Sequence, residues 1–308
     1  MTIVKSLISK LLGHSSEFER KLEALQVLQG TGVANINRTR YPFASLAEAE
    51  FKVFSQFGED GILQYLIFES GIMRAEQSFI EFGVQDYSES NTRLLLLKDN
   101  WRGLILDGSD EHMQKVRRSD LYWRQDLTAV SAWIDRDNIN TLIGDSGFSG
   151  DVGLLSIDID GNDYWVWERI SVVRPIIVVT EWNSVFGSQH AVSVPYDPAF
   201  NRTAFHYSNL AWGASIAAFE HLASSKGYAL VGSNSAGNNL FFVRNDRLGR
   251  IKRFTAQAAY VESRFRDSRN SAGELSFLAG ACRAQEIIDV PLVDVISNTL
   301  TTLRQLGI

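Results

Sequence analysis

Acidic residues stand directly after four short apolar runs of this 308-residue sequence, and their types and spacing could bind a nucleoside or a metal ion. The runs end at Glu81, at Asp107, at Asp158 and Asp160, and at Glu181. If the runs are parallel strands of one sheet, these carboxylates share the carboxyl edge, where ligands of open α/β sheets bind. The sequence therefore predicts one polar ligand site that several strands build together.

The strongest metal candidate is the pair Asp158 and Asp160. The two residues are two positions apart, so on a strand both side chains point to the same face. With Glu181 and Asn183 they could complete an all-oxygen site suited to magnesium or another hard divalent ion. The alternative is that Asp160 caps a helix starting near Asn162 and that no metal binds.

A bound ion would help a hydroxyl to attack, because an aliphatic hydroxyl has a pKa of about 15.7, near that of water. Without a metal, a general base has to take the proton. His190 and His206, in the loop after Glu181, could act as this base, and so could an acidic residue such as Asp158. Each histidine could equally be an exposed loop residue without a role.

The first two acidic positions suit a nucleoside cofactor. Asp107 follows Glu81 by 26 residues, which is the place of the carboxylate that accepts hydrogen bonds from ribose hydroxyls. Gly83 would let the backbone approach the ligand closely. The alternative for Asp107 is a turn residue in DGSD that caps the next helix.

Strands and helices alternate after an expected loop at about 30–42. The segments SFIEFGV, GLILDGS, VGLLSIDID and PIIVVTE read as buried parallel strands, and YWRQD is a weaker strand candidate. Helices are expected at about 89–100, 111–119, 128–143 and 162–170. This alternation predicts a doubly wound α/β sheet with right-handed crossovers.

The alternation of strands and helices ends after Glu181. Residues 182–210 form a long segment that we expect to act as a lid or substrate-binding loop. A helix at about 214–226 and a hairpin, GYALVG and NLFFVR, come next, and the chain looks helical beyond Arg250. We therefore divide it into an N-terminal helical extension (1–54), a central domain (55–250) and a C-terminal helical extension (251–308).

The charge, the cysteine content and the length of the apolar runs limit the classes of protein to which the chain could belong. A formal charge of −6 gives no broad basic surface for nucleic acid. The single cysteine, Cys282, excludes an internal disulfide and fits a cytoplasmic location. No apolar run is long enough to span a bilayer. Apolar residues at helical spacing in 4–12 indicate a helix that packs on the domain, on a second subunit or on a membrane surface.

Several segments of the sequence, taken together, resemble those of a known family. In order along the chain, these segments are FIEFG…SNT, GLILDGS, NIN, LLSIDIDGNDYWVW, P.IIVVTEWN, VPYDP, GAS and NNLFFVR. The family that they resemble is the FkbM-like branch of class I S-adenosylmethionine-dependent methyltransferases. The similarity extends from about Ser55 to Arg244. It implies a Rossmann-like seven-stranded doubly wound sheet whose last strand, NLFFVR, is antiparallel. It also implies methyl transfer from S-adenosylmethionine to a hydroxyl of a small-molecule or glycan acceptor, such as a sugar or a secondary metabolite.

The resemblance also implies roles for particular residues. The cofactor loop would extend from Glu81 to Asn91, with Glu81 and Gly83 nearest the amino-acid end of the cofactor. Asp107 would hold the ribose and Asp126 would lie near the adenine. Near the transferred methyl, Asp158 would begin the acceptor side. Related sugar O-methyltransferases that use magnesium place acidic ligands at the ends of the fourth and fifth strands, which matches Asp158 or Asp160 and Glu181.

One stretch departs from the family pattern. Relatives look like EFGVGDGxExNT, whereas this chain has Gln85 and Tyr87 in place of the two later glycines. Tyr87 could stack on the cofactor, or the loop could be wider. The change admits a second hypothesis, a cofactor-free scaffold on the same fold.

A third hypothesis is a nucleotide-sugar modifying Rossmann enzyme, for which the sequence lacks the GxGxxG fingerprint. GxxxxGK[ST], GxSxG and HExxH are absent as well, which weakens the P-loop, α/β-hydrolase and zincin classes. The terminal helices make a homodimer plausible.

Overall fold

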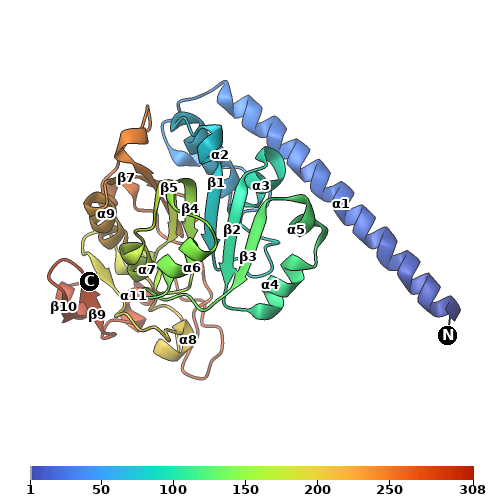
Figure 1. Cartoon of the computed structure of the whole chain (residues 1–308). Helices are drawn as coiled ribbons and strands as arrows, with labels where there is room; N and C mark the ends of the chain where they lie inside the picture. Colours follow the sequence, from blue (N-terminus) through green and yellow to red (C-terminus); the bar gives the residue numbers. More distant parts are fainter. Residues whose placement is uncertain (1) are drawn as a thin grey trace.

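A single seven-stranded sheet organises the protein in this computed structural model, which describes the backbone of residues 2–308 and the side chains of residues 17–308. The strand order is β3-β2-β1-β4-β5-β8-β7 (Figure 1). The strands are β1 (Ser78–Phe82), β2 (Arg102–Asp107), β3 (Leu127–Ser131), β4 (Gly150–Ile157), β5 (Val173–Glu181), β7 (Tyr228–Ser233) and β8 (Asn239–Arg244). Strands β1 to β5 are parallel, and β8 is antiparallel to both of its neighbours. The predicted seven-stranded sheet with an antiparallel last strand is confirmed.

Helices cover both faces of the sheet, as expected of a doubly wound fold. One face packs on α6 (Ile139–Asp145), α7 (Asp163–Arg169) and α9 (Ile216–Ser225). The other face packs on α2 (Glu59–Glu69), α3 (Arg93–Asp99) and α4 (Asp110–Arg117). Side chains alternate between the two cores along each strand: Ile80 belongs to the first core and Phe79 to the second. The apolar runs of the sequence are continuous because their strands are buried on both faces.

The third strand differs from its prediction. YWRQD is not a strand: its first residues belong to helix α5 (Asp120–Arg124), and the strand is the next segment, LTAVS. The helix expected at 128–143 begins only at Ile139. Strand β3 is an edge strand that pairs with β2 alone, and three of its five residues are only partly buried. A short, half-exposed edge strand lacks the long apolar run that identified the central strands.

The N-terminal extension is one long helix, α1 (Thr2–Arg38), which contacts α2 and α3. It continues through most of the loop expected at 30–42, so only the end of that prediction is correct. The side chains of 4–12, which carry the expected amphipathic pattern, lie outside the described residues. A short helix, η1 (Leu46–Glu48), follows and buries Leu46 in the second core. Among the described residues no helix combines the length and apolar character needed to cross a lipid bilayer.

The C-terminal segment is helical only in part. It contains α10 (Ala256–Ala259), α11 (Ala281–Glu286) and α12 (Leu303–Leu306), joined by irregular chain and by the hairpin of β9 (Leu292–Asp294) and β10 (Thr299–Thr301). The short elements of this segment pack against a neighbouring surface, and no long helix forms in it.

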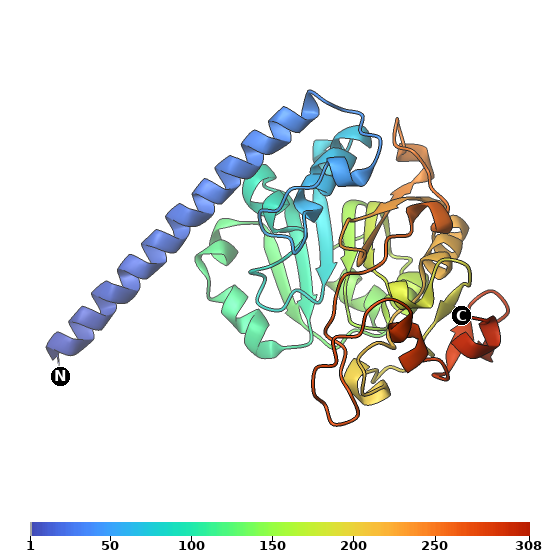
Figure 2. The same cartoon turned by 180° about the vertical axis from the view of Figure 1, so that it is seen from behind.

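That neighbouring surface is the segment after β5, which contains η3 (Ser184–Phe186), β6 (Val192–Ser193) and α8 (Arg202–Phe205). Strand β6 pairs with β9, and Phe186 and Val192 share a third core with Leu292 and Leu303. Figures 1 and 2 show the end of the chain beside β9 and β10, on the same side of the molecule as α11. The expected loop 182–210 is thus a packed layer over the carboxyl ends of the strands.

Candidate functional site

A cavity of about 730 Å³ opens at the carboxyl edge of the parallel strands. Four of the acidic strand ends predicted to share this edge are brought together there: Asp107, Asp158, Asp160 and Glu181 line the cavity. The layer after β5 and the C-terminal segment form the remaining wall. The cavity therefore has a strand-end side and a side built from loops.

On the strand-end side, Asp107 ties two loops together. One carboxylate oxygen accepts a hydrogen bond from the backbone N–H of Gln85 (2.7 Å), and the other accepts one from the N–H of Ser109 (2.8 Å). The residue is 8% exposed and lines the cavity. Each oxygen keeps a free lone pair, so the carboxylate can still accept a hydrogen bond from a ligand.

Gly83 lies at the closest approach of the β1 loop to the end of β4. Its φ is +72°, and a Cβ at this position would stand 1.7 Å from the carbonyl oxygen of Asp158. Both facts require glycine. The structure places Gly83 in the cavity wall, and the close approach of its backbone to a ligand stays a prediction.

The two residues that stand in place of the family's glycines keep a backbone geometry typical of glycine. Gln85 has a φ of +48° and Tyr87 a φ of +63°, both in the left-handed region. The loop is therefore not rebuilt around larger residues. Tyr87 does not line the cavity: its ring is fully buried, and its hydroxyl forms a hydrogen bond with Thr92 Oγ1 (2.9 Å). The predicted stacking of Tyr87 on a cofactor does not fit this position.

Glu81 and Asn91 also stabilise the loop from within. The buried Glu81 carboxylate accepts hydrogen bonds from the N–H of Asn91 and from the hydroxyls of Ser90 and Thr92. The Asn91 side chain donates to Ser156 Oγ at 3.1 Å. Burial raises the pKa of Glu81, and these hydrogen bonds oppose the rise. Both residues hold the loop in shape and do not line the cavity.

The family resemblance implies a position near the adenine for Asp126, which would require a third strand at YWRQ. Asp126 precedes β3 instead, at the amino end of the strand and away from the cavity. Trp133, just beyond the carboxyl end of β3, occupies the wall beside Asp107. Its ring lies 3.3 Å from the Cβ position of Gly108, and its indole N–H donates to Pro198 O. Correct placement of β3 would have identified this tryptophan.

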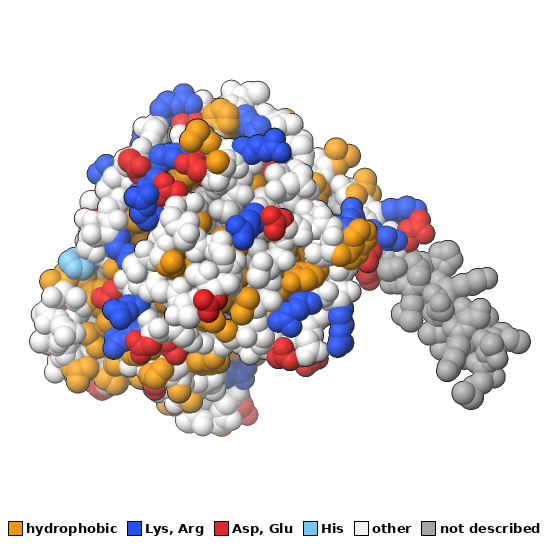
Figure 3. Space-filling view, viewed as in Figure 1, with side chains coloured by type: hydrophobic (Ala, Val, Ile, Leu, Met, Phe, Trp, Pro, Cys, Tyr) orange, Lys and Arg blue, Asp and Glu red, His pale blue; other side chains and the backbone are white. Residues whose placement is uncertain are grey.

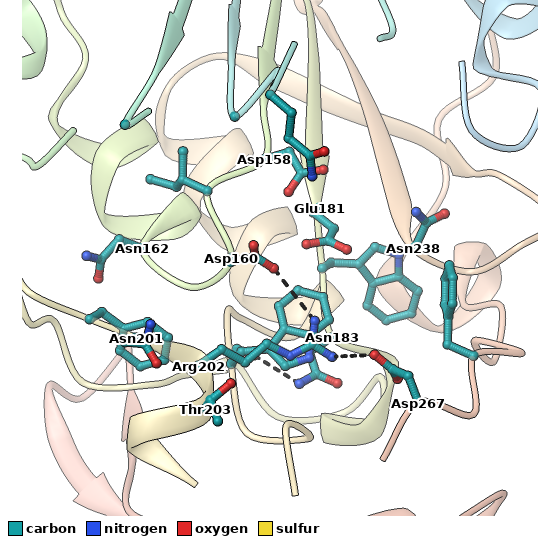
Figure 4. A pocket seen from close by; sticks show the side chains of 18 of the residues that line it. Asp158, Asp160, Asn162, Glu181, Asn183, Asn201, Arg202, Thr203, Asn238 and Asp267 are labelled. Atoms are coloured by element: carbon teal, nitrogen blue, oxygen red, sulfur yellow. Dashed lines mark hydrogen bonds and ion pairs between the residues drawn. The ribbon is translucent and has the colours of Figure 1, made fainter. Parts of the chain in front are cut away.

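The acidic cluster stands at the centre of the cavity (Figure 4). Carboxylate oxygens of Asp158, Asp160 and Glu181 lie within 4.8 Å of one another. Asp158 is exposed to the cavity, yet the surrounding chain partly desolvates its carboxylate. This desolvation, followed by repulsion from Asp163 and Asp160, raises the pKa of Asp158 well above its ordinary value. Burial and repulsion from Asp158 do the same for Glu181. The accessible surface of these side chains faces the cavity.

This cluster fits a hard divalent cation. Three carboxylates supply oxygen ligands, and Glu181 Oε2 is buried without a hydrogen-bond partner. A cation would neutralise the mutual repulsion that raises the pKa values. The turn after β4 is held by Asp163, whose carboxylate accepts from the N–H of Ile159 and of Gly161.

Asn183, predicted as a fourth ligand, forms side-chain hydrogen bonds with the protein backbone. Its amide donates to Leu210 O and Trp212 O, and its Oδ1 accepts from Val185 N at 3.0 Å. The residue builds the layer over the strands and caps η3. Asn183 also lines the cavity and its Oδ1 keeps a second lone pair, so its role as a ligand stays a prediction.

Neither predicted histidine belongs to the residues that line the cavity. His206 stacks on Tyr207 with ring centroids 4.4 Å apart, and its Nδ1 forms a hydrogen bond with Ser208 Oγ. Partial burial lowers its pKa. His190 contributes a backbone carbonyl that accepts from Ser215 Oγ. The structure gives no support to either as a base at this site.

The wall opposite the strand ends carries two guanidinium groups that the sequence reasoning missed. Arg202, from α8, lies between Asp160 (3.6 Å) and Asp267 (3.4 Å) and over the ring of Trp212 (Figure 4). Arg283, from α11, is 5% exposed and pairs with Glu262 at 2.8 Å. These residues had no recognisable motif, because they reach the site from segments far apart in the sequence.

The remainder of this wall is polar and aromatic. Asn162, Asn201, Thr203 and Asn238 present amides and a hydroxyl, and Trp182, Trp212 and Phe265 present rings. The Trp182 indole nitrogen and Asn162 Oδ1 are buried without hydrogen-bond partners. Such unpaired polar groups can bind a polar ligand that enters the cavity.

No protein-family model matches the sequence, and no curated protein matches it. Among solved structures, the O-methyltransferase from Bacillus cereus in complex with SAH is 15% identical, with 70% of this chain and 90% of that chain covered and a TM-score of 0.41. The N-terminal domain of EvdMO1 with SAH bound is 11% identical over 63% of this chain and 81% of that one, with a TM-score of 0.39.

A third solved structure, the DszA carbon methyltransferase, is 12% identical over 63% of this chain and 54% of that one, with a TM-score of 0.37. The identities and TM-scores are too low to assign an activity to this chain. Its function has to be inferred from the site itself.

Proposed function

We propose that this protein is an S-adenosylmethionine-dependent O-methyltransferase that acts on a hydroxyl of a sugar, a glycan or a secondary metabolite. The observation that carries the proposal is Asp107, a carboxylate at the end of β2 that holds both neighbouring loops and still faces the cavity. In a sheet of this order, that position suits an acceptor for the two ribose hydroxyls of a nucleoside cofactor.

The proposed cofactor side comprises the residues around this carboxylate. Asp107 would hold the ribose, and the glycine backbone at Gly83 would lie against the amino-acid end of the cofactor. Trp133 would cover the adenine, since it is 60% exposed and lies beside Gly108 in the cavity wall. Aromatic faces bind bases by stacking.

The proposed acceptor side begins at the acidic cluster. Asp158, Asp160 and Glu181 would hold a divalent ion such as magnesium, which when bound lowers the pKa of a hydroxyl ligand. The amide groups and rings of the outer wall suit a polyhydroxylated acceptor, because amides pair with hydroxyls and rings cover the apolar faces of sugars. Arg202 would orient the acceptor from the opposite side.

A cofactor-free scaffold is the competing function, motivated by the lost glycines. The loop retains left-handed backbone at both positions, and the Asp107 contacts are intact, which favours a working cofactor site. Calorimetric titration of metal-stripped protein with S-adenosylhomocysteine, repeated with magnesium, separates the two. We expect saturable binding, abolished by Asp107→Ala and retained in Asp126→Ala, the acidic residue at the wrong end of β3.

Absence of binding to the folded wild-type protein would refute the methyltransferase proposal. Binding that is unchanged by Asp107→Ala would refute the proposed ribose contact. For the metal, magnesium should bind the wild type and fail to bind Asp158→Ala. That variant should also lose methyl transfer while retaining S-adenosylhomocysteine binding, and normal turnover would remove Asp158 from the mechanism.

A further inference from the structure

The described part of α1 presents an apolar stripe to solvent. Phe18 is 67% exposed, Leu22 47%, Leu25 61% and Ile36 64%. Figure 3 shows hydrophobic side chains among charged ones on the described part of this helix. Aliphatic and aromatic side chains that recur on one face of a helix are normally buried. In the described structure they have no covering element, so the stripe needs an explanation.

The stripe faces outward because contacts with the domain fix the rotation of α1 about its axis. Ala34 and Asn37 are buried against the domain, and a Cβ at Gly30 would stand 2.6 Å from Val53. Glu23 forms an ion pair with Arg93, at the start of α3. The helix cannot turn to bury its stripe on its own domain without breaking these contacts.

The spacing of the stripe is that of a coiled-coil seam. The positions 18, 22, 25, 29, 32 and 36 alternate steps of four and three residues, and all six are exposed. Only two of them are not apolar, Gln29 and Gly32. The same register continues through the preceding sequence at Ser15, Leu11, Ile8 and Val4, in order toward the N-terminus. A strict repeat of this kind forms the narrow contact surface between two helices.

We propose that α1 pairs with α1 of a second copy of this chain, so that the protein is a homodimer held by a coiled coil. Polar seam residues such as Gln29 are compatible with such pairing and would help to fix its register. Leu28, which is 67% exposed and directly precedes a seam position, would widen the contact.

Charge favours a second copy over a membrane surface as the occupant of the stripe. Residues 2–38 carry five basic side chains (Lys5, Lys10, Arg20, Lys21, Arg38) and three acidic ones (Glu17, Glu19, Glu23), a net charge of only +2. Helices that bind membrane surfaces are rich in lysine and arginine on the polar face, which attracts anionic lipid. A helix with so small a net charge gains little from that attraction. Acidic and basic side chains balance within residues 17–38, so two copies can pair there without net repulsion.

Sedimentation velocity of the full chain, from micromolar to submillimolar concentration, tests the proposal with two neighbouring substitutions. Leu25→Glu places a charge in the seam, and Ala24→Glu places the same charge on the adjacent exposed position outside it. We expect the wild type and Ala24→Glu to be dimers. Leu25→Glu should raise the dimer dissociation constant roughly 100-fold, because each dimer loses two buried leucines.

Circular dichroism and thermal unfolding should show both variants folded, since both side chains are exposed in the protomer. A wild-type protein that stays monomeric throughout this range would overturn the proposal. Equal dissociation constants for the two variants would place any dimer contact elsewhere. A monomeric wild type that co-sediments with anionic vesicles through Leu25 would assign the stripe to a membrane.

Discussion

The closest backbone approach in the candidate site gives the sharpest test of how it is built. Gly83→Ala introduces a Cβ that would stand 1.7 Å from the Asp158 carbonyl oxygen, where real contacts are essentially never shorter than 3.0 Å. The β1 loop and the end of β4 must therefore separate by at least 1.3 Å, the difference between these two distances. The two sides of the site would no longer share the observed geometry.

The magnitude has two parts. A non-glycine residue in left-handed backbone costs about 1–2 kcal/mol, and overpacking a well-packed region costs roughly 1–3 kcal/mol more. Gly71→Ala is the matched control, because Gly71 has a φ of +60° with no atom within 4 Å of a Cβ. It should lose only the first part.

The assay is urea unfolding of both variants together with calorimetric titration of S-adenosylhomocysteine. Gly83→Ala should be less stable than Gly71→Ala by roughly 1–3 kcal/mol and should bind the ligand at least tenfold more weakly. Gly71→Ala should bind as the wild type does. Equal stabilities and equal affinities would refute the claim that the approach of Gly83 to Asp158 shapes the site.

Three further predictions follow from single side chains. Gln85→Gly should change the free energy of unfolding by less than about 1 kcal/mol, because relief of left-handed backbone strain offsets the extra chain entropy of glycine. Tyr87→Gly should lower the free energy of unfolding by at least about 3 kcal/mol, because a buried ring is lost. Urea unfolding measures both, and a stable Tyr87→Gly would contradict the buried position. Trp133→Phe should remove most of the change in tryptophan fluorescence on S-adenosylhomocysteine binding, whereas Trp123→Phe, at an exposed position outside the cavity wall, should retain it. Burial raises the pKa of Asp163 to about 7, above its unfolded value, so its ionisation opposes folding above that pH. Stability contributed by Asp163 should therefore increase as the pH falls from 8 to 5, and Asp163→Asn should show a smaller increase than the wild type in urea unfolding at these two values.

The central strands could be predicted because burial on both faces leaves a continuous apolar run. Such runs end at Asp107, Asp158 and Glu181, and parallel pairing places these ends together without further information. Strand β3 was misplaced by a few residues because an edge strand is only half buried. The expected adenine contact at Asp126 depends on that misplaced strand, because Asp126 precedes β3 whereas the cavity lies at the carboxyl end of the strands.

The loop contacts could not be read from sequence. Glu81 stands at a strand end like the other acidic residues, yet it faces inward to hold Ser90 and Thr92, because the loop folds back over it. Arg202 and Arg283 meet the site through tertiary packing of segments with weak local patterns. Residue types and their spacing therefore predicted the side of the cavity at the strand ends. The opposite side depends on how the segment after β5 and the C-terminal segment pack over the sheet.

The pairing of β6 with β9 has a consequence for the order in which the site is assembled during synthesis. The wall around Asp107 and Asp158 lies at the ends of β2 and β4 in about the first half of the chain, whereas a domain folds as a unit. The opposite wall needs Arg283 and the strand at Leu292–Asp294, more than a hundred residues later. The cavity is therefore complete only after the C-terminal segment has been synthesised.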